Sequence, residues 1–397
     1  MTAARSPRAL FCALVIVAAA ANMLRTILHA PEAVQPWDFI CFWTAGHAWS
    51  LGASPYDMTL AVNAVPEGFT QWPFVYPPAA RVLFEPFGRL PFALSWALYK
   101  IAQTACWGAA CWLVARRVGA PGGTLAPTAA LAGYLGFVSY PALASTASGQ
   151  VVAFLVLALA RLLALPEGRG AWARTALILV VLSLKPQLGL PLAVVIVARW
   201  ADWRAVVAAS VVLGALTLWG CLGRPDLILP EFAANLALYG EQGPNGVFKT
   251  SGLPLMLALA GLPWPTGAWP ALLSLVPAAL VAASRLPRER ALLVATVSLL
   301  LVQPNHEHGY LLLIAFVPTV LAAPRAFRTA FLACGAGFAL SVPLGLALGP
   351  AGPAGLFLGP VIDAACIAVL FGATIRWLSW KPSAARQPVA ASEAAPA

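Results

Sequence analysis

The sequence predicts an all-α polytopic membrane protein, and three observations support this fold class. Of its 397 residues, 61% are hydrophobic and only 10% are charged, whereas soluble domains carry about 25% charged residues. Apolar runs of about 20 residues, the length that crosses a bilayer as a helix, recur along the whole chain. Basic residues stand in small groups between these runs, and this positive-inside pattern accounts for the net charge of +10 without a nucleic-acid partner.

The first expected helix covers residues 9–28, with its basic start in the cytoplasm. The next segment, residues 29–90, then lies outside, because it is too polar and too broken by Pro and Gly to span a bilayer. Within it, residues 39–51 and 79–90 are short and aromatic-rich. We expect both to lie in the membrane interface as amphipathic helices.

The following part of the chain predicts two further spans, a turn and a fourth helix. The spans are residues 91–115 and 124–140. A turn of small residues at 141–149 leads to the fourth helix, which starts near Gln150 and ends within residues 161–169.

Residues 175–198 decide the topology, because Arg174 and Arg199 flank this apolar segment at both ends. One crossing would place one basic end outside, so we expect a hairpin with Lys185 and Pro186 at its tip. Proline breaks a helix, and each arm of 11 to 13 residues is roughly half a bilayer long. The alternative is one long kinked helix with the lysine reaching for the surface.

The second half of the chain repeats this organisation. Its expected elements are a helix at 205–222, a second external loop at 223–250, a re-entrant or interfacial segment at 251–262, a helix at 267–283, a second hairpin of 291–302 and 309–323 with a polar tip at 303–308, and helices at 329–348 and 355–377. Together these make about 12 spans in one integral membrane domain, residues 1–380, with the external loop 29–90 carrying catalysis. Residues 381–397 are expected to form a disordered cytoplasmic tail.

In this topology the unusual polar residues fall on one side of the membrane. They are Asp38, Asp57, Tyr76, Gln150, Lys185, Gln187, Lys249, His306, Glu307 and His308. A transporter places polar residues on both sides of the bundle, so this asymmetry favours an enzyme at the outer face. Taken singly, Asp38 could cap a helix and Asp57 could belong to a turn. The histidine spacing is not a known metal motif, and we expect neither a metal nor another cofactor, although Asp57 or Glu307 could hold a metal.

A combination of short motifs resembles glycosyltransferase family 87. They are Asp38-Phe39, Phe42-Trp43-Thr44-Ala45-Gly46, Gly52, Pro55-Tyr56-Asp57, Tyr76-Pro77-Pro78, Gly149-Gln150, Leu184-Lys185-Pro186-Gln187 and Arg199-Trp200. The resemblance extends from the first helix to about residue 323. It implies a GT-C-like bundle that works in the cell inner (plasma) membrane, with its active site facing the periplasm or outside. It also implies that a hexose, usually mannose, is transferred with inversion from a polyprenyl-phosphate sugar to a lipid or glycan acceptor.

The resemblance also assigns roles to residues. Asp38 stands at the position of the catalytic acid, where a carboxylate can deprotonate an acceptor hydroxyl. Lys185, His306 and His308 are expected to bind the donor phosphate, although Glu307 separates histidines that are paired in relatives. The remaining residues expected to contact substrate are Trp43, Tyr56, Asp57, Tyr76, Gln150, Gln187 and Glu307.

Two alternatives stay open from the sequence. Within enzymes, the same lipid carrier could deliver another sugar, such as arabinose, glucose or galactosamine. In another class, the chain could be a lipid-linked-sugar flippase or a small-molecule transporter.

The topology makes a prediction for single-cysteine labelling in a background without native cysteines. An impermeant thiol reagent added outside should label position 57, and it should not reach position 174. Labelling of position 174 from outside, or of position 57 only from inside, would contradict the topology.

Overall fold

The computed structural model describes residues 36–65, 69, 72–117, 139–164, 170–241, 250–263, 269–304, 306–348 and 353–379, with isolated residues 17, 20, 21 and 24. Three expected segments therefore lie outside the described residues. They are almost all of the first helix, the helix at 124–140 apart from Ser139 and Tyr140, and the tail at 381–397. Within these ranges the chain is helical and contains no β-strand, as the composition predicts.

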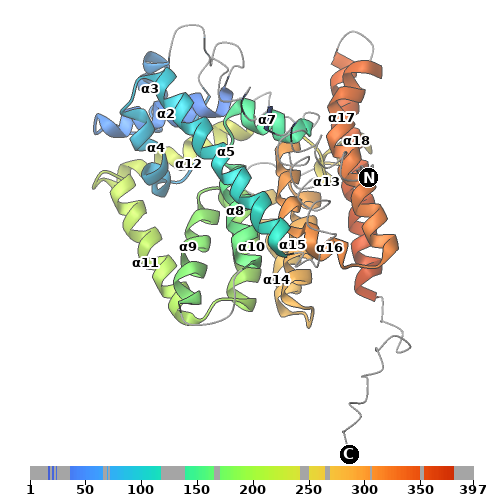
Figure 1. The fold of residues 1–397 in the computed structure, drawn as a ribbon. Coiled ribbons are helices and arrows are strands. Elements are labelled where there is room, and N and C mark those ends of the chain that lie inside the picture. The colour runs from blue at the N-terminus through green and yellow to red at the C-terminus, as the bar shows by residue number, and fades with distance from the viewer. Residues whose placement is uncertain are drawn as a thin grey trace, which may run out of the picture.

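The described helices follow one another in the order shown in Figure 1. They are α2 (Trp37–Ser50), α3 (Met58–Ala64), η2 (Pro78–Ala80), α4 (Arg81–Gly88), α5 (Phe92–Arg117), α7 (Tyr140–Ser148), α8 (Val152–Leu163), α9 (Ala171–Ser183), α10 (Pro186–Arg199), α11 (Trp203–Gly220), α12 (Pro225–Glu241), α13 (Leu253–Leu259), α14 (Trp269–Ala283), α15 (Arg288–Val302), η6 (Glu307–Phe316), α16 (Val317–Leu321), α17 (Arg325–Leu348) and α18 (Pro353–Ser379).

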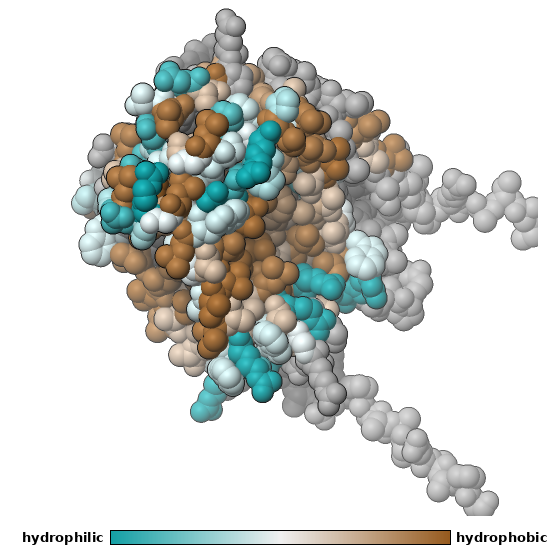
Figure 2. Space-filling view, turned by 90° about the vertical axis from the view of Figure 1, so that its left-hand side faces the viewer, coloured by the Kyte–Doolittle hydropathy of each residue, from teal (hydrophilic) through white to brown (hydrophobic). Residues whose placement is uncertain are grey.

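Two of the described helices are long and apolar enough to cross a membrane, α11 and the Leu358–Ser379 part of α18. Five other apolar helices are shorter, with 10 to 17 residues each. On the face that carries α11, apolar side chains dominate the middle and hydrophilic ones gather toward the two ends (Figure 2). The chain therefore has the helical, apolar character of a membrane protein, while the count of about 12 spans stays a prediction.

Helices α9 and α10 form an antiparallel hairpin that turns at Lys185. Gly189 of α10 packs directly against Leu182 of α9, because a Cβ atom at Gly189 would come within 1.8 Å of the Leu182 carbonyl oxygen. The outer ends of the two helices, at Ala171 and Trp200, line one pocket. The chain thus returns to the end from which it came, which confirms the hairpin and excludes one kinked span.

A second hairpin joins α15 to η6 and α16. The Thr319 hydroxyl on α16 donates a hydrogen bond to Glu289 in the first turn of α15, with an O–O distance of 2.7 Å. The returning arm starts as a 3₁₀-helix of 10 residues, longer than the usual three or four. As predicted, polar residues connect the two arms: Gln303 caps the end of α15, and His306 precedes the first residue of η6.

Helix α2 corrects the expectation that residues 39–51 form an amphipathic helix. Eight consecutive residues, 39–46, are buried, so α2 is a core helix rather than one with an apolar and a polar face. It crosses α4 where Gly46 meets Gly88, and a Cβ atom at Gly46 would lie 2.1 Å from the Phe84 carbonyl oxygen. Only glycine permits so close an approach of two helix backbones.

An aromatic cluster holds the segment 36–92 together and attaches it to α5. Its buried aromatic members are Phe39, Phe42, Trp43, Trp49, Tyr56, Phe74, Tyr76, Phe84, Trp96 and Tyr99. Phe39 packs against two rings of α5. Its ring centroid lies 5.1 Å from that of Trp96 and 4.8 Å from that of Tyr99. Because Phe39 adjoins Asp38, this packing fixes the start of α2.

Two segments that the sequence analysis expected to be irregular are helical. The turn predicted at 141–149 is helix α7, which has Pro141 in its first turn and ends at Gly149. Both are favoured positions for these residues at helix ends. The loop expected at 223–250 contains α12, which has Pro225 as its first residue.

The hairpin makes a prediction for Gly189→Ala. The new methyl group would overlap the Leu182 carbonyl, so the variant should lose stability by about 1–3 kcal/mol. Thermal unfolding of the purified protein measures the loss.

Gly214→Ala on α11 is the matched control, because no atom lies within 4 Å of a Cβ at that position. That variant should be neutral or gain up to about 1 kcal/mol from the better helix propensity of alanine. Equal melting temperatures for the two variants would contradict the close packing of α9 against α10.

Candidate functional site

Asp38 lies in the first turn of α2, but it does not cap that helix. The N-cap position is Pro36, and no side chain caps the helix end. The Asp38 carboxylate instead accepts hydrogen bonds from the side chains of Ser148 and Gln150. The capping alternative is therefore excluded, and the carboxylate faces the junction of α7 and α8.

The backbone holds Gln150 firmly at this junction. Gly149 adopts a left-handed conformation with a φ of 81°, and a Cβ atom there would lie 2.6 Å from Cβ of Phe39. Glycine is therefore required both for the turn and for the contact with α2. The Gln103 side chain of α5 donates a 2.8 Å hydrogen bond to the Gln150 carbonyl oxygen.

Lys185 joins the same site from the tip of the first hairpin. Its Nζ donates a 2.8 Å hydrogen bond to Oε1 of Gln150, and both residues are 6% exposed. Gln150 thus contacts Lys185 and Asp38 at the same time. The result is a polar chain of a buried cation, a buried amide and a half-buried carboxylate, drawn from three segments more than 30 residues apart in sequence.

The second hairpin brings His306 and His308 to this chain. Their rings stack with centroids 5.5 Å apart, and His306 is close enough to Asp38 to stabilise its negative charge. Lys185 and His306 both act electrostatically on His308. The site therefore combines one carboxylate with one lysine and two imidazoles.

The tips of the two hairpins are also bonded to each other. The Gln303 side chain donates a 2.6 Å hydrogen bond to the Gln187 carbonyl oxygen and a 2.8 Å hydrogen bond to the Ser274 hydroxyl. The expected contact of Gln187 with substrate stays a prediction. In this structure its backbone positions the tip that carries Lys185.

Burial raises the pKa of Asp38 above its ordinary value. Desolvation by the surrounding protein is the largest cause. Lys185, His306 and the two side-chain hydrogen bonds act in the opposite direction, because each favours the charged carboxylate. The sequence could not rank these effects, and the structure shows that desolvation outweighs the charges.

Three aromatic residues expected to bind substrate have contacts within the aromatic cluster. The Trp43 indole donates to the Leu90 carbonyl oxygen at 3.0 Å. The Tyr56 hydroxyl donates to the Tyr76 carbonyl oxygen at 2.7 Å. Tyr76 packs edge-on against Phe42 with ring centroids 4.9 Å apart. These contacts stabilise the fold, and any contact with substrate remains a prediction.

Asp57 is the N-cap of α3. Its carboxylate accepts hydrogen bonds from the backbone N–H groups of Thr59 at 2.9 Å and Leu60 at 3.3 Å. This is the turn role that the sequence left open beside substrate binding. The remaining expected residue, Glu307, has a side chain outside the described part of the structure.

The structure adds Ser148 and Gln103 to the site, and it shows a further buried polar residue, Lys100. Ser148 contacts Asp38 directly, and Gln103 holds the backbone of Gln150. Lys100 is 1% exposed with its Nζ 4.1 Å above the Trp96 ring, and it has no hydrogen-bond partner in the described part of the chain. A lysine inside an apolar helix is a functional candidate by default. Lys100 could therefore have been identified as a candidate from the sequence alone.

Comparison with known proteins gives one match. A family model, glycosyltransferase family 87, matches residues 74–304, more than half of the chain. This range includes Gln150 and Lys185, begins after Asp38 and ends before His306. No curated protein and no solved structure matches the chain.

Proposed function

The chain belongs to glycosyltransferase family 87, and we propose that it transfers a hexose from a polyprenyl-phosphate sugar to a lipid or glycan acceptor. Mannose is our first candidate for the sugar. We place the reaction at the non-cytoplasmic face of the cell inner membrane, with inversion at the anomeric carbon. The observation that carries the proposal is the polar chain in which half-buried Asp38 contacts buried Gln150, which in turn accepts a hydrogen bond from buried Lys185.

Asp38 is the general base in this proposal. A sugar hydroxyl is a weak nucleophile, and a carboxylate that accepts its proton during attack raises the rate. The raised pKa of Asp38 brings its basicity closer to what proton abstraction needs at neutral pH. The hydrogen bonds from Ser148 and Gln150 hold the carboxylate in place. Single displacement with inversion needs only one such base.

Lys185 and the histidines bind the donor phosphate in this proposal. The leaving group is a lipid phosphate, which departs without protonation if cations stabilise its charge. Lys185 is a buried cation whose one described hydrogen-bond acceptor is the neutral amide of Gln150. A lysine at membrane depth is costly unless it meets an anion. Asp38 supplies one negative charge nearby, and a bound phosphate would supply a second.

The apolar surroundings of the site favour a lipid donor. Asp38, Lys185 and the histidines lie at one end of a helical bundle whose buried core is hydrophobic. A polyprenyl chain can reach such a site from the bilayer, whereas a nucleotide sugar would need a soluble phosphate-binding loop. Among the described residues, most of the buried core is apolar and only a few polar side chains are buried in it, which disfavours a transport path.

Asp38→Asn tests the base. The amide keeps the shape of the side chain but cannot accept the proton, so transfer should fall by about 10²–10⁴-fold. Donor binding and folding should persist. Product formation from a polyprenyl-phosphate sugar and membrane acceptors, followed by mass spectrometry, measures the effect.

Asp57→Asn is the matched control for this experiment. Asparagine caps a helix as well as aspartate does, so this variant should be nearly silent. Near-normal turnover in Asp38→Asn together with lost turnover in Asp57→Asn would transfer the role of base to Asp57. Normal turnover in both variants would remove the general-base step from the proposal.

Lys185→Ala tests the phosphate contact and the electrostatics together. It should weaken donor binding far more than acceptor binding, and Lys185→Arg should retain part of the activity because the charge survives. The rate depends on the unprotonated Asp38, so it falls as the pH drops through the pKa of Asp38. In the wild type the midpoint of this acid limb of the pH–rate profile should lie at a pH above about 3.9, the pKa of a free aspartate.

Loss of Lys185 removes a positive charge that lowers the Asp38 pKa. The acid limb of kcat/KM should therefore move to higher pH in Lys185→Ala. An unchanged Michaelis constant and turnover for the donor would exclude the phosphate contact. An acid limb of kcat/KM at the same pH as in the wild type would show that the charge of Lys185 does not act on the pKa of Asp38.

A further inference from the structure

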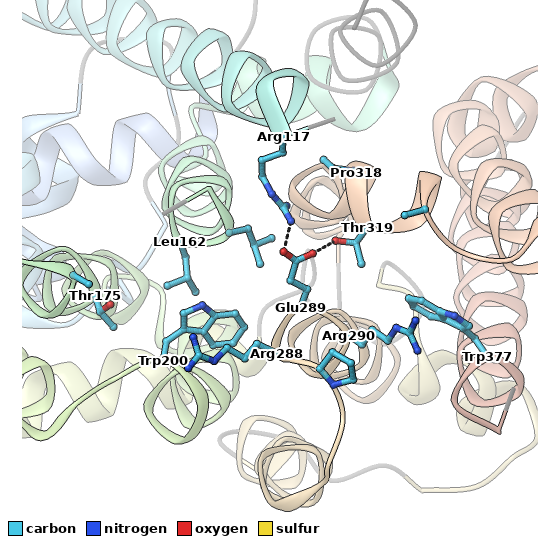
Figure 3. Close-up of a pocket in the computed structure, with 14 residues that line it drawn as sticks. Arg117, Leu162, Thr175, Trp200, Arg288, Glu289, Arg290, Pro318, Thr319 and Trp377 are labelled. Atoms are coloured by element: carbon cyan, nitrogen blue, oxygen red, sulfur yellow. Dashed lines mark hydrogen bonds and ion pairs between the residues drawn. The ribbon is translucent and has the colours of Figure 1, made fainter. Parts of the chain in front are cut away.

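A pocket of about 790 Å³ opens at the end of the bundle opposite to Asp38. The ends of α5, α8, α10 and α18 and the starts of α9 and α15 line it, together with α16 (Figure 3). Helices α9 and α10 run between this pocket and Lys185 with 13 and 14 residues. Their length of roughly 20 Å separates the pocket from the candidate active site.

The lining of the pocket is basic. Arg117, Arg288 and Arg290 contribute to it, and Glu289 is the one carboxylate among the described lining residues. Arg117 contacts Glu289 at 2.5 Å, and Thr319 donates to the same carboxylate at 2.7 Å (Figure 3). The internal carboxylate is thus already bonded, and the described lining carries three arginines and one glutamate.

The start of α15 adds a further positive contribution. Pro287 is its N-cap and makes no side-chain capping bond. The first N–H groups of a helix have no partner within the helix, and they carry the positive end of its dipole. Pro287, Arg288, Glu289 and Arg290 all line the pocket, so this helix end faces the same space as the arginines.

Two indole rings complete the pocket, those of Trp200 and Trp377. The guanidinium of Arg290 lies 4.7 Å from the centre of the Trp377 ring. Trp377 is 4% exposed, and its indole N–H has no hydrogen-bond partner in the part of the chain that the structure describes. A buried donor without an acceptor costs free energy, and an oxygen-rich ligand would supply that acceptor.

We propose that this pocket binds a phosphate group, carried by an anionic phospholipid headgroup or supplied as soluble phosphate. Guanidinium groups bind phosphate through paired N–H donors. The basic groups of the sequence gather at this end of the bundle, which the positive-inside pattern assigns to the cytoplasm. Anionic lipids are concentrated in that leaflet, and basic pockets between membrane helices bind their headgroups.

Native mass spectrometry of the purified full-length protein tests the proposal. The probes are phosphatidylglycerol, zwitterionic phosphatidylcholine and inorganic phosphate. Phosphatidylglycerol should bind more tightly than phosphatidylcholine, and Arg288→Gln with Arg290→Gln should weaken it on the order of tenfold or more. Arg288→Lys with Arg290→Lys should retain part of the affinity, because the charges remain.

Glu289→Gln gives a change of opposite sign. It removes the one carboxylate of the described lining and releases Arg117 for the ligand, so anion binding should strengthen. Arg204→Gln with Arg325→Gln is the matched control, because both arginines are exposed and neither lines the pocket. This control should keep the wild-type affinity although it loses the same charge.

The outcomes separate the two sources of phosphate. Displacement of the lipid by millimolar inorganic phosphate identifies a soluble phosphate site, and resistance to it identifies a lipid headgroup site. Equal affinity in the glutamine pair and the wild type overturns the proposal. So does equal weakening in the exposed control pair, or a loss of binding in Glu289→Gln with an unchanged melting temperature.

Discussion

The hydrogen bond from Lys185 to Gln150 is the interaction on which the candidate site depends. A lysine among apolar helices is costly unless its ammonium group finds an acceptor. Here the acceptor is the Gln150 side chain, 2.8 Å away. The same amide also contacts Asp38. The need to satisfy one buried cation therefore brings together the start of α2, the junction of α7 and α8, and the tip of the first hairpin.

Close backbone contacts at glycine make this arrangement possible. Gly149 turns the chain between α7 and α8 and leaves no room for a side chain beside Phe39. Gly189 lets α10 pack against α9, and so fixes the hairpin whose tip is Lys185. Larger residues at either position would separate the backbones. The polar groups of the site would then lie too far apart to bond.

The two ends of the bundle differ in their chemistry. At one end a carboxylate with a raised pKa meets a lysine and two imidazoles. At the other end, arginines surround a pocket whose carboxylate is already paired. In the described part of the chain the core between them is mostly apolar, with a few buried polar side chains such as Lys100 and Asp363. The two polar ends are thus separated by a largely hydrophobic core.

Hydropathy and the placement of basic residues determined the helical fold and both hairpins. These signals can be taken from the sequence alone, because arginines at both ends of an apolar segment indicate that both ends lie on the same side of the membrane. The helices α7 and α12 were missed, since residues such as Pro141 and Gly149 read as a turn but also begin and end helices.

The sequence by itself also determined which residues were candidates for the site, among them Asp38, Lys185, His306 and His308. Only the tertiary structure decided their partners. From the sequence, Asp38 could have capped α2 and Asp57 could have joined the site. In the folded chain the Asp38 carboxylate contacts Gln150, and the Asp57 carboxylate accepts hydrogen bonds from N–H groups at the start of α3. The balance between desolvation and nearby cations at Asp38 also depends on how deeply it is packed. That depth is set by contacts between segments more than 100 residues apart, which no local pattern records.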